Sequence, residues 1–302
     1  MSEHYPRVRI AAEHGELLVR DGLTICFYLR RSHQEVAQAV LRSLESYLRV
    51  VGEDSLGWYV DTEGEMQRLE GEGWKHIRRE LLEARSPMIQ LRESPGGASA
   101  YAFEYHGKWL EDPRRAQASQ AVSAACFWLP TEFLEAHGPE RVRALALEMA
   151  ALLPFGSGHA GLSFNALTGL LSGPEPWRRM AFRYPGMDLL ELGELSLHLG
   201  ARVRAPHWLT FLGQPVVGEL GGAEGLRARL SSPGTAVESL EGDRIAVTLG
   251  HGPEAGDLEA GRDLPRYREL ARVLEPWLYQ RPVAPRDLSA EHRRRWERRF
   301  LD

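Results

Sequence analysis

The chain has 302 residues, of which 43% are hydrophobic and 26% are charged, and its formal net charge is −5. This composition is typical of a globular protein with a sizeable core and excludes a disordered chain. The mild negative charge argues against direct binding of nucleic acid, which calls for a basic surface. Its apolar runs are too short to span a membrane, its N-terminus lacks a secretory signal, and two cysteines form no disulfide framework. We therefore expect a cytoplasmic protein.

Residues 1–85 alternate between strand and helix periodicity. In chain order, the predicted elements are a hairpin over 7–20, a turn at Asp21-Gly22, a strand over 23–29, a helix over 36–51, a short strand over 57–60 and a second helix from Met66 to Arg85. Ser32 and Glu35 have the spacing of a capping box, which favours a helix start at this point. This block is the first predicted α+β unit.

Residues 86–190 repeat that order. The predicted elements are a hairpin over 88–105, a strand over 121–129, a helix from about Pro139 and a returning strand over 162–164. Cys126-Phe127-Trp128-Leu129 matches Cys26-Phe27-Tyr28-Leu29 at a separation of 100 residues. We interpret the two blocks as related β-β-β-α-β-type units, with chance similarity of two aromatic strands as the alternative.

Residues 191–302 form a looser C-terminal α+β element with terminal helices. Its predicted elements are strands over 197–203 and 208–212, a short helix over 226–230, a hairpin over 236–249 and a helix from about Asp263. The arginines of residues 286–302 predict a docked, solvated helix and not a nucleic-acid-binding arm. The predicted fold class is therefore α+β, with mainly antiparallel sheets and one compact body.

Motifs for catalysis or cofactor binding are weak. Residues 156–161 match G-x-G-x-x-G, but a dinucleotide site needs a preceding strand and a following helix, so we expect a helix end and a turn here and no cofactor. The histidines are scattered, and the closest pair, His198 and His207, has no neighbouring Cys or His to complete a metal site. We expect no catalytic residue. The alternative is an enzyme with a site between the two halves, near His159, Asn165, Arg183 and Asp188.

The two cysteines permit two interpretations. Cys26 and Cys126 could form a redox pair, or they could be small buried residues at equivalent positions of repeated strands. Both lie in aromatic-rich apolar runs, where cysteine behaves as a small hydrophobic residue. We therefore favour the structural role.

The strongest local charge lies in residues 53–72. This acidic segment has seven acidic residues against Arg68 alone, a net charge of −6. A solvated surface is one interpretation, and a docking surface for a basic partner is the other. The candidate partner-binding residues are Glu53, Asp54, Trp58, Asp61, Glu63, Glu65, Glu70, Glu72 and Trp74.

A series of short motifs resembles a known family. The motifs are Phe127-Trp128-Leu129-Pro130, residues 153–161, Arg183-Tyr184-Pro185-Gly186-Met187-Asp188, residues 208–213, Leu220-Gly221-Gly222, residues 247–250, Gly256-Asp257, Leu264-Pro265, Tyr267-Arg268 and Leu274-Glu275-Pro276-Trp277. Their order across residues 20–280 is similar to that of the TsiV-like type VI secretion immunity family.

The resemblance implies a non-enzymatic antitoxin. Such a protein binds a toxic effector encoded by a neighbouring gene and occludes its active surface, and the related effectors include nucleases that act in the cytoplasm. The family supplies no catalytic or contact residues that can be transferred to this chain.

Overall fold

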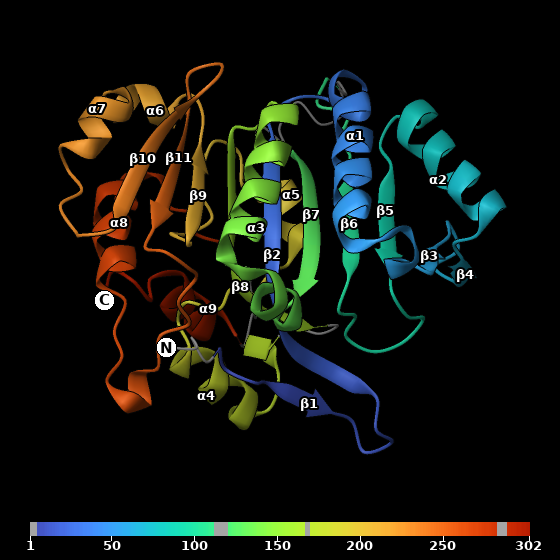
Figure 1. Cartoon of the computed structure of the whole chain (residues 1–302), viewed down its shortest axis with the longest axis horizontal. Helices are drawn as coiled ribbons and strands as arrows, with labels where there is room; N and C mark the ends of the chain where they lie inside the picture. Colours follow the sequence, from blue (N-terminus) through green and yellow to red (C-terminus); the bar gives the residue numbers. More distant parts are fainter. Residues whose placement is uncertain (1–4, 112–119, 167–169, 283–288) are drawn as a thin grey trace.

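The computed structural model describes residues 5–111, 120–166, 170–282 and 289–302. It combines α-helices with an antiparallel sheet (Figure 1), which confirms the predicted α+β class. In the described ranges, no helix has the length and apolar character needed to cross a bilayer.

Eleven strands in the described ranges form one sheet. They are β1 (Arg9–Ala11), β2 (Leu17–Leu29), β3 (Trp58–Val60), β4 (Met66–Arg68), β5 (Met88–Arg92), β6 (Ala102–His106), β7 (Ser123–Pro130), β8 (Ser157–Ala166), β9 (Leu209–Leu212), β10 (Thr235–Leu240) and β11 (Arg244–Leu249). Their order is β10-β11-β9-β8-β2-β7-β6-β5-β3-β4, and β1 pairs with the start of β2.

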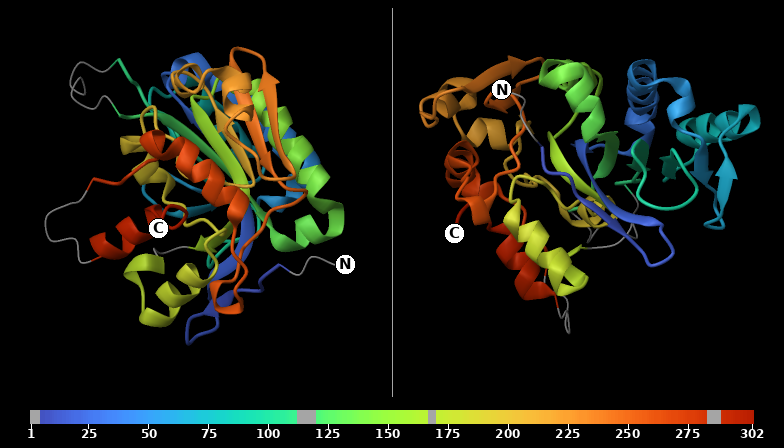
Figure 2. Two further views of the ribbon diagram at one scale, coloured as in Figure 1. Left: turned by 90° about the vertical axis from the view of Figure 1, so that its left-hand side faces the viewer. Right: turned by 60° about the horizontal axis from the view of Figure 1, so that its bottom comes forward.

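The described helices cover both faces of this sheet. They are α1 (His33–Val51), α2 (Gly71–Glu83), α3 (Thr131–Leu152), α4 (Glu175–Arg183), α5 (Leu192–His198), α6 (Val216–Glu219), α7 (Gly222–Arg227), α8 (Pro265–Leu274) and α9 (Ala290–Glu297). Helices α1 and α3 lie together on one face, and α5 lies on the other (Figure 1). Helices α4 and α9 pack against each other through Phe182 and Trp296, whose rings lie 5.8 Å apart (Figure 2).

Strand β2 is the centre of the fold because both of its faces are buried. Its side chains alternate, as a strand requires. Ile25 and Phe27 belong to the large core beneath α1 and α3, whereas Cys26 and Tyr28 belong to a smaller core with α5. A run of consecutive apolar residues therefore fits this strand, since no face of it meets water.

The matching strands lie side by side. β2 pairs antiparallel with β7, and Cys26 is directly opposite Cys126. Helix α1 follows β2 and helix α3 follows β7, and the two helices contact each other. Strands from all three sequence blocks share the sheet. The division at residues 85 and 190 therefore stays a proposal about repeated units.

Two predicted turns are strand instead. Asp21-Gly22 lies inside β2, because the buried Asp21 carboxylate accepts a hydrogen bond of 2.8 Å from the Val8 amide. The residues from Ser157 to Gly161 lie inside β8, between β2 and β9, so the predicted helix end and turn was wrong. Gly158 is needed there, since a Cβ atom would lie 2.7 Å from the Phe27 ring.

Two predicted elements have another structure. The helix predicted from Met66 begins only at Gly71, because Met66–Arg68 pairs with β3 across a turn. Asp61 closes that turn by accepting hydrogen bonds from the amides of Glu63 and Glu65. The strand predicted over 197–203 was wrong. Its first residues belong to α5, which packs Leu192 and Leu195 onto the smaller core at helical spacing, and only Val203 makes an isolated bridge, to Leu278.

Candidate functional site

A buried ionic cluster lies beneath the sheet, around Asp188. The backbone of Asp188 is bridged to β8: its amide donates to the Leu162 carbonyl, and its carbonyl accepts from the Phe164 amide. The side chain therefore has a fixed place next to β8, and it is completely buried. Because an isolated buried charge is very costly, the carboxylate requires partners.

Two arginines and two histidines surround this carboxylate. Arg204 and Arg299 each place Nη2 near Oδ1, at 3.4 Å and 3.6 Å. His207 and His159 each place Nε2 near Oδ2, at 3.3 Å and 3.7 Å. All four side chains are buried. The cluster thus draws on β8, on the segment before β9 and on the C-terminal end of the described chain.

Several backbone contacts fix these partners. Arg299 donates from Nε to the Pro185 carbonyl at 2.7 Å, and Arg204 donates from Nη2 to the Leu189 carbonyl at 3.1 Å. His207 donates from Nδ1 to the Ala205 carbonyl at 2.9 Å, which directs Nε2 to Asp188. The rings of His159 and His207 are stacked, with centroids 3.9 Å apart. The arrangement is closed to solvent.

The electrostatics of the cluster favour an ionised carboxylate. Burial acts to raise the pKa of Asp188, but Arg204, His207 and Arg299 outweigh it and hold that pKa well below its ordinary value. Burial, followed by the neighbouring His207, lowers the pKa of His159, so its neutral form is favoured. The two arginines thus neutralise this carboxylate, and they also interact with the nearby Glu297.

The same geometry bears on metal binding. The ligand atoms of His159, Asp188 and His207 lie within 4.8 Å of one another, as a metal site would require. Sequence spacing did not predict this grouping, because the three residues are far apart in the chain. Arg204 and Arg299, however, already face the Asp188 carboxylate, so a divalent cation would have to compete with two arginines for it. The arginines balance the charge of this carboxylate.

The four residues of the alternative enzymatic site are only partly brought together. His159 and Asp188 are neighbours, but neither is exposed by more than 1%. Arg183 lies elsewhere and pairs with Asp257 at 2.8 Å. Asn165 lies farther along β8 and accepts a hydrogen bond from Ser163 at 2.6 Å. No substrate can reach the His159–Asp188 pair without a rearrangement of the core.

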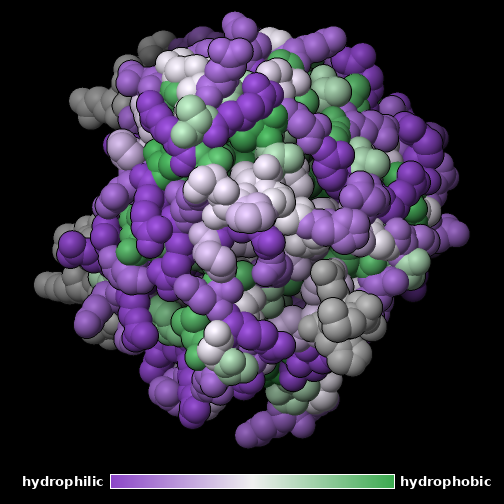
Figure 3. Space-filling view, turned by 60° about the vertical axis from the view of Figure 1, so that its left-hand side comes forward, coloured by the Kyte–Doolittle hydropathy of each residue, from purple (hydrophilic) through white to green (hydrophobic). Residues whose placement is uncertain are grey.

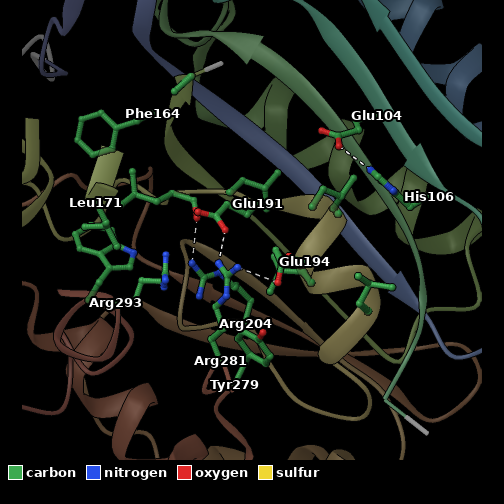
Figure 4. Close-up of a pocket in the computed structure, with 18 of the residues that line it drawn as sticks. Glu104, His106, Phe164, Leu171, Glu191, Glu194, Arg204, Tyr279, Arg281 and Arg293 are labelled. Atoms are coloured by element: carbon green, nitrogen blue, oxygen red, sulfur yellow. Dashed lines mark hydrogen bonds and ion pairs between the residues drawn. The ribbon is translucent and has the colours of Figure 1, made fainter. Parts of the chain in front are cut away.

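A cavity of about 620 Å³ lies beside the cluster (Figure 4). It is bounded by β5, β6 and β7, by α5 and by the segments around Tyr279 and α9. Some of its charged side chains pair with one another: Arg281 contacts Glu191 and Glu194, and His106 contacts Glu104 at 2.8 Å. These pairs give the cavity a mixed charge that indicates no particular ligand.

The acidic segment lies far from this cluster in the sheet. Strand β4 is the last strand in the sheet order, and five strands separate it from β8. Glu53, Asp54, Glu63, Glu65, Glu70 and Glu72 are exposed, whereas Trp58, Asp61 and Trp74 are half-buried. Asp61 is committed to the β3–β4 turn, and the Trp58 ring is covered by the Arg68 guanidinium at 4.4 Å.

Trp74 has a different environment. It packs against the large core and lines a groove of about 380 Å³ between α1 and α2, together with Leu44 and Ile77. At the other end of the sheet, the face formed by α6, α7 and α8 is mostly hydrophilic and its apolar residues are scattered (Figure 3). A groove lined by apolar side chains and by Glu45, Arg49, Glu53 and Arg78 thus distinguishes the α1–α2 end.

The basic C-terminal segment is docked, but not all of its arginines are solvated. In α9 and the residues after it, Trp296 and Phe300 are buried as their spacing predicts. Arg299 is buried too, and points to Asp188. The charge pattern alone gave no sign of this inward arginine, because it lies among exposed residues of the same type.

Comparisons with known proteins agree with this architecture. A family model described as "TsiV: Type VI immunity for VRR-NUC" matches residues 39–300. The chain therefore belongs to the TsiV family of type VI immunity proteins, which confirms the resemblance of its sequence motifs. A search of the curated proteins found no match.

The fold is shared with proteins of known structure. One of them is described as "Pseudomonas aeruginosa T6SS protein PA0821" and superposes with a TM-score of 0.79 at 19% sequence identity. The alignment covers 97% of this chain and 87% of that chain. At this identity, the likeness establishes a common fold over almost the whole molecule.

The burial of the cysteines leads to a first expected result. Neither Cys26 nor Cys126 is exposed to solvent. We expect both thiols to resist iodoacetamide in the native protein and to react after unfolding in guanidinium. A Cys26→Ala/Cys126→Ala double variant should retain the protective function of the chain. Rapid labelling of the native protein, or a well-folded double variant without protection, would contradict a purely structural role in the native state.

A second expected result follows from the burial of His159. Its pKa is lowered by burial, so the unfolded chain binds a proton more readily than the folded one does. The contribution of His159 to the free energy of unfolding is fully present above about pH 6.5, which is the pKa of histidine in an unfolded chain. This contribution is lost as the pH falls through the lower pKa that His159 has in the folded chain. We expect the free energy of unfolding to decrease from pH 7.5 to pH 5.

A His159→Gln variant provides the control for this pH dependence. The free energy of unfolding of this variant should decrease more gently over the same pH range. We expect the variant still to protect, because His159 is closed to solvent. Denaturant unfolding at several pH values measures the first property, and a toxicity assay measures the second. An unchanged pH dependence would contradict the assignment, and loss of protection with intact folding and effector binding would favour the enzymatic alternative.

Proposed function

We propose that this chain binds a type VI effector with a VRR-NUC nuclease domain and neutralises it. The match to the TsiV family over residues 39–300 carries this proposal, because the family is described as immunity for VRR-NUC. The structural likeness to a T6SS protein from Pseudomonas aeruginosa supports the proposal that the effector belongs to a type VI secretion system. The effector would be encoded by a neighbouring gene.

The proposed mechanism is occlusion of the effector's active surface, without catalysis. The buried charges around Asp188 are inaccessible, which favours a rigid body that acts through its surface over an enzyme that uses these groups. A stable interface of standard size buries roughly 1,200–2,000 Å² in total. We place the action in the cytoplasm, where the nucleic acid that such a nuclease cleaves is found.

The acidic segment is the proposed contact surface. A nuclease must present Lys or Arg side chains where it binds phosphates, so exposed carboxylates of an inhibitor can form ion pairs with the same side chains. The exposed glutamate quartet consists of Glu63, Glu65, Glu70 and Glu72. The groove beside it, lined by Trp74, can take an apolar side chain of the effector. The charges would then determine the rate of association with the effector, and the apolar packing would determine the rate of dissociation.

Co-purification tests direct binding. We would co-express the chain with a nuclease-inactive form of the neighbouring VRR-NUC effector and analyse the eluate by size exclusion with light scattering. A stable complex of defined stoichiometry supports the proposal. Two separate proteins at micromolar concentration would contradict it, and turnover of a small molecule by the purified chain would favour the enzymatic alternative.

A further inference from the structure

The row of side chains across the centre of the smaller core has a chemistry that the proposed immunity function does not use. Three neighbouring strands place His159, Cys26 and Cys126 in one lateral row, because His159 pairs with Cys26 across β8 and β2, and Cys26 pairs with Cys126 across β2 and β7. The row continues to Glu104 on β6. Residues paired in this way point to the same face of a sheet.

The two thiols are in direct contact. Their sulfur atoms lie 2.7 Å apart, and both residues are fully buried. Directly opposite residues of antiparallel strands have Cα atoms about 4.5–5.5 Å apart, which lies within the range that a disulfide can bridge. No movement of either strand is therefore needed to join the two sulfurs.

The charges around the pair distinguish the two thiols. Burial raises the pKa of Cys26, but the contact with Cys126 and the neighbouring His159 lower it to about 7 overall. Burial raises the pKa of Cys126, and Cys26 and Glu104 raise it further. In the folded sheet the thiolate form is therefore favoured at Cys26 over Cys126.

We propose that Cys26 and Cys126 are an oxidisable dithiol that forms a cross-strand disulfide when the chain folds in the presence of a low-molecular-weight disulfide such as oxidised glutathione. While the strands are still apart, the thiolate of one cysteine attacks one sulfur of glutathione disulfide and releases a glutathione thiolate. As β2 and β7 pair, the other cysteine attacks the protein sulfur of the mixed disulfide and releases the second glutathione thiolate. Both glutathione thiolates take up the protons of the protein thiols, so two protein thiols and one glutathione disulfide become one protein disulfide and two glutathione thiols.

Accessibility explains when this reaction occurs. Both thiols are closed to solvent in the folded chain, so reagents reach them while the sheet is open, before β2 and β7 have paired. Once formed, the bond would close a loop of about 100 residues at the centre of the sheet. In a reducing cytoplasm the pair stays a dithiol, and the proposed binding surface is unaffected in either state.

Refolding tests this proposal with the wild-type chain. We would unfold the reduced protein in guanidinium, refold one sample with excess glutathione disulfide and another with dithiothreitol, and count thiols under denaturing conditions. We expect a monomer with no free thiol and a mass lower by about 2 Da in the first sample, and two free thiols in the second. The oxidised form should melt higher, by on the order of 5 °C.

A Cys126→Ser variant is the matched control. It should give one thiol or one glutathione adduct in the same buffer, and no decrease of 2 Da. Two free thiols in the refolded wild-type monomer, two glutathione adducts on one chain, or a disulfide that only links two chains would each overturn the proposal. Because the measurement counts thiols in the isolated chain, its outcome is independent of effector binding.

Discussion

Replacing the four residues of the exposed glutamate quartet by Gln is expected to slow association with the VRR-NUC effector about tenfold at low salt. The physical reason is that the quartet lies on the β3–β4 turn and at the start of α2, where its charges are exposed and can steer a basic partner. The dependence of the association rate on ionic strength should become weaker, and the dissociation rate should change much less. Stopped-flow or surface-based kinetics over a salt series measures all three.

A second quartet at other sites provides the control. Gln substitutions at Glu13, Glu219, Glu224 and Glu241 change the net charge equally, and all four side chains are exposed outside the acidic segment. We expect the association rate of this variant to stay close to that of the wild type. If both variants associate alike, or if a complex leaves residues 53–72 in solvent, the acidic segment is not part of the interface. The family membership would stand in either case.

Replacing Asp188 by Ala is expected to decrease the free energy of unfolding by about 3–5 kcal/mol, because the substitution leaves Arg204 and Arg299 buried without their carboxylate. Denaturant unfolding at pH 7 measures this loss. Asp188→Asn keeps the volume and removes only the charge, so it should lose most of the same stability. The exposed Asp54→Ala is the control and should stay within about 0.5 kcal/mol of the wild type.

The outcome of this variant also decides the role of the cluster. If Asp188→Ala loses less than about 1 kcal/mol and abolishes protection, then the cluster serves function and not folding. If it is destabilised but still binds the effector when folded, the cluster only holds the C-terminal residues against β8. We expect the second result, since all five charged or titratable members are buried.

Sequence periodicity was sufficient for the central part of the fold. The apolar run of Leu23–Leu29, the helix after it and the matching strand around Cys126 were all predicted, and they form β2, α1 and β7. At the start of α1 the Glu35 carboxylate accepts a hydrogen bond from the Ser32 amide at 2.9 Å, as the capping-box spacing predicts. These features depend on residues that are close together in the sequence, so the sequence alone was sufficient to predict them.

Prediction failed where a distant contact overrides a local signal. Asp21-Gly22 has turn residues, yet it continues β2 because Asp21 pairs with Arg9 and Gly22 packs against Asn165 on β8. Met66–Arg68 has no strand pattern of its own, but it pairs with β3. Neither set of contacts can be predicted from the local sequence of these two segments.

The buried cluster could not be predicted for the same reason. Asp188 and His207 lie outside the regular elements, and Arg299 follows α9 among other arginines. No spacing rule connects these positions, and only the fold brings them to β8. The acidic segment, in contrast, is contiguous in sequence, so its charge was evident before its place at the edge of the sheet was known.

Titration of nuclease activity tests the central claim most directly. Purified VRR-NUC effector from the neighbouring gene would be mixed with increasing amounts of this chain, and cleavage of its nucleic-acid substrate would be followed. Direct occlusion predicts a linear decrease to zero activity at a fixed stoichiometric ratio, with no effect of the chain on an unrelated nuclease. Full cleavage at a tenfold molar excess of folded chain would contradict neutralisation by binding.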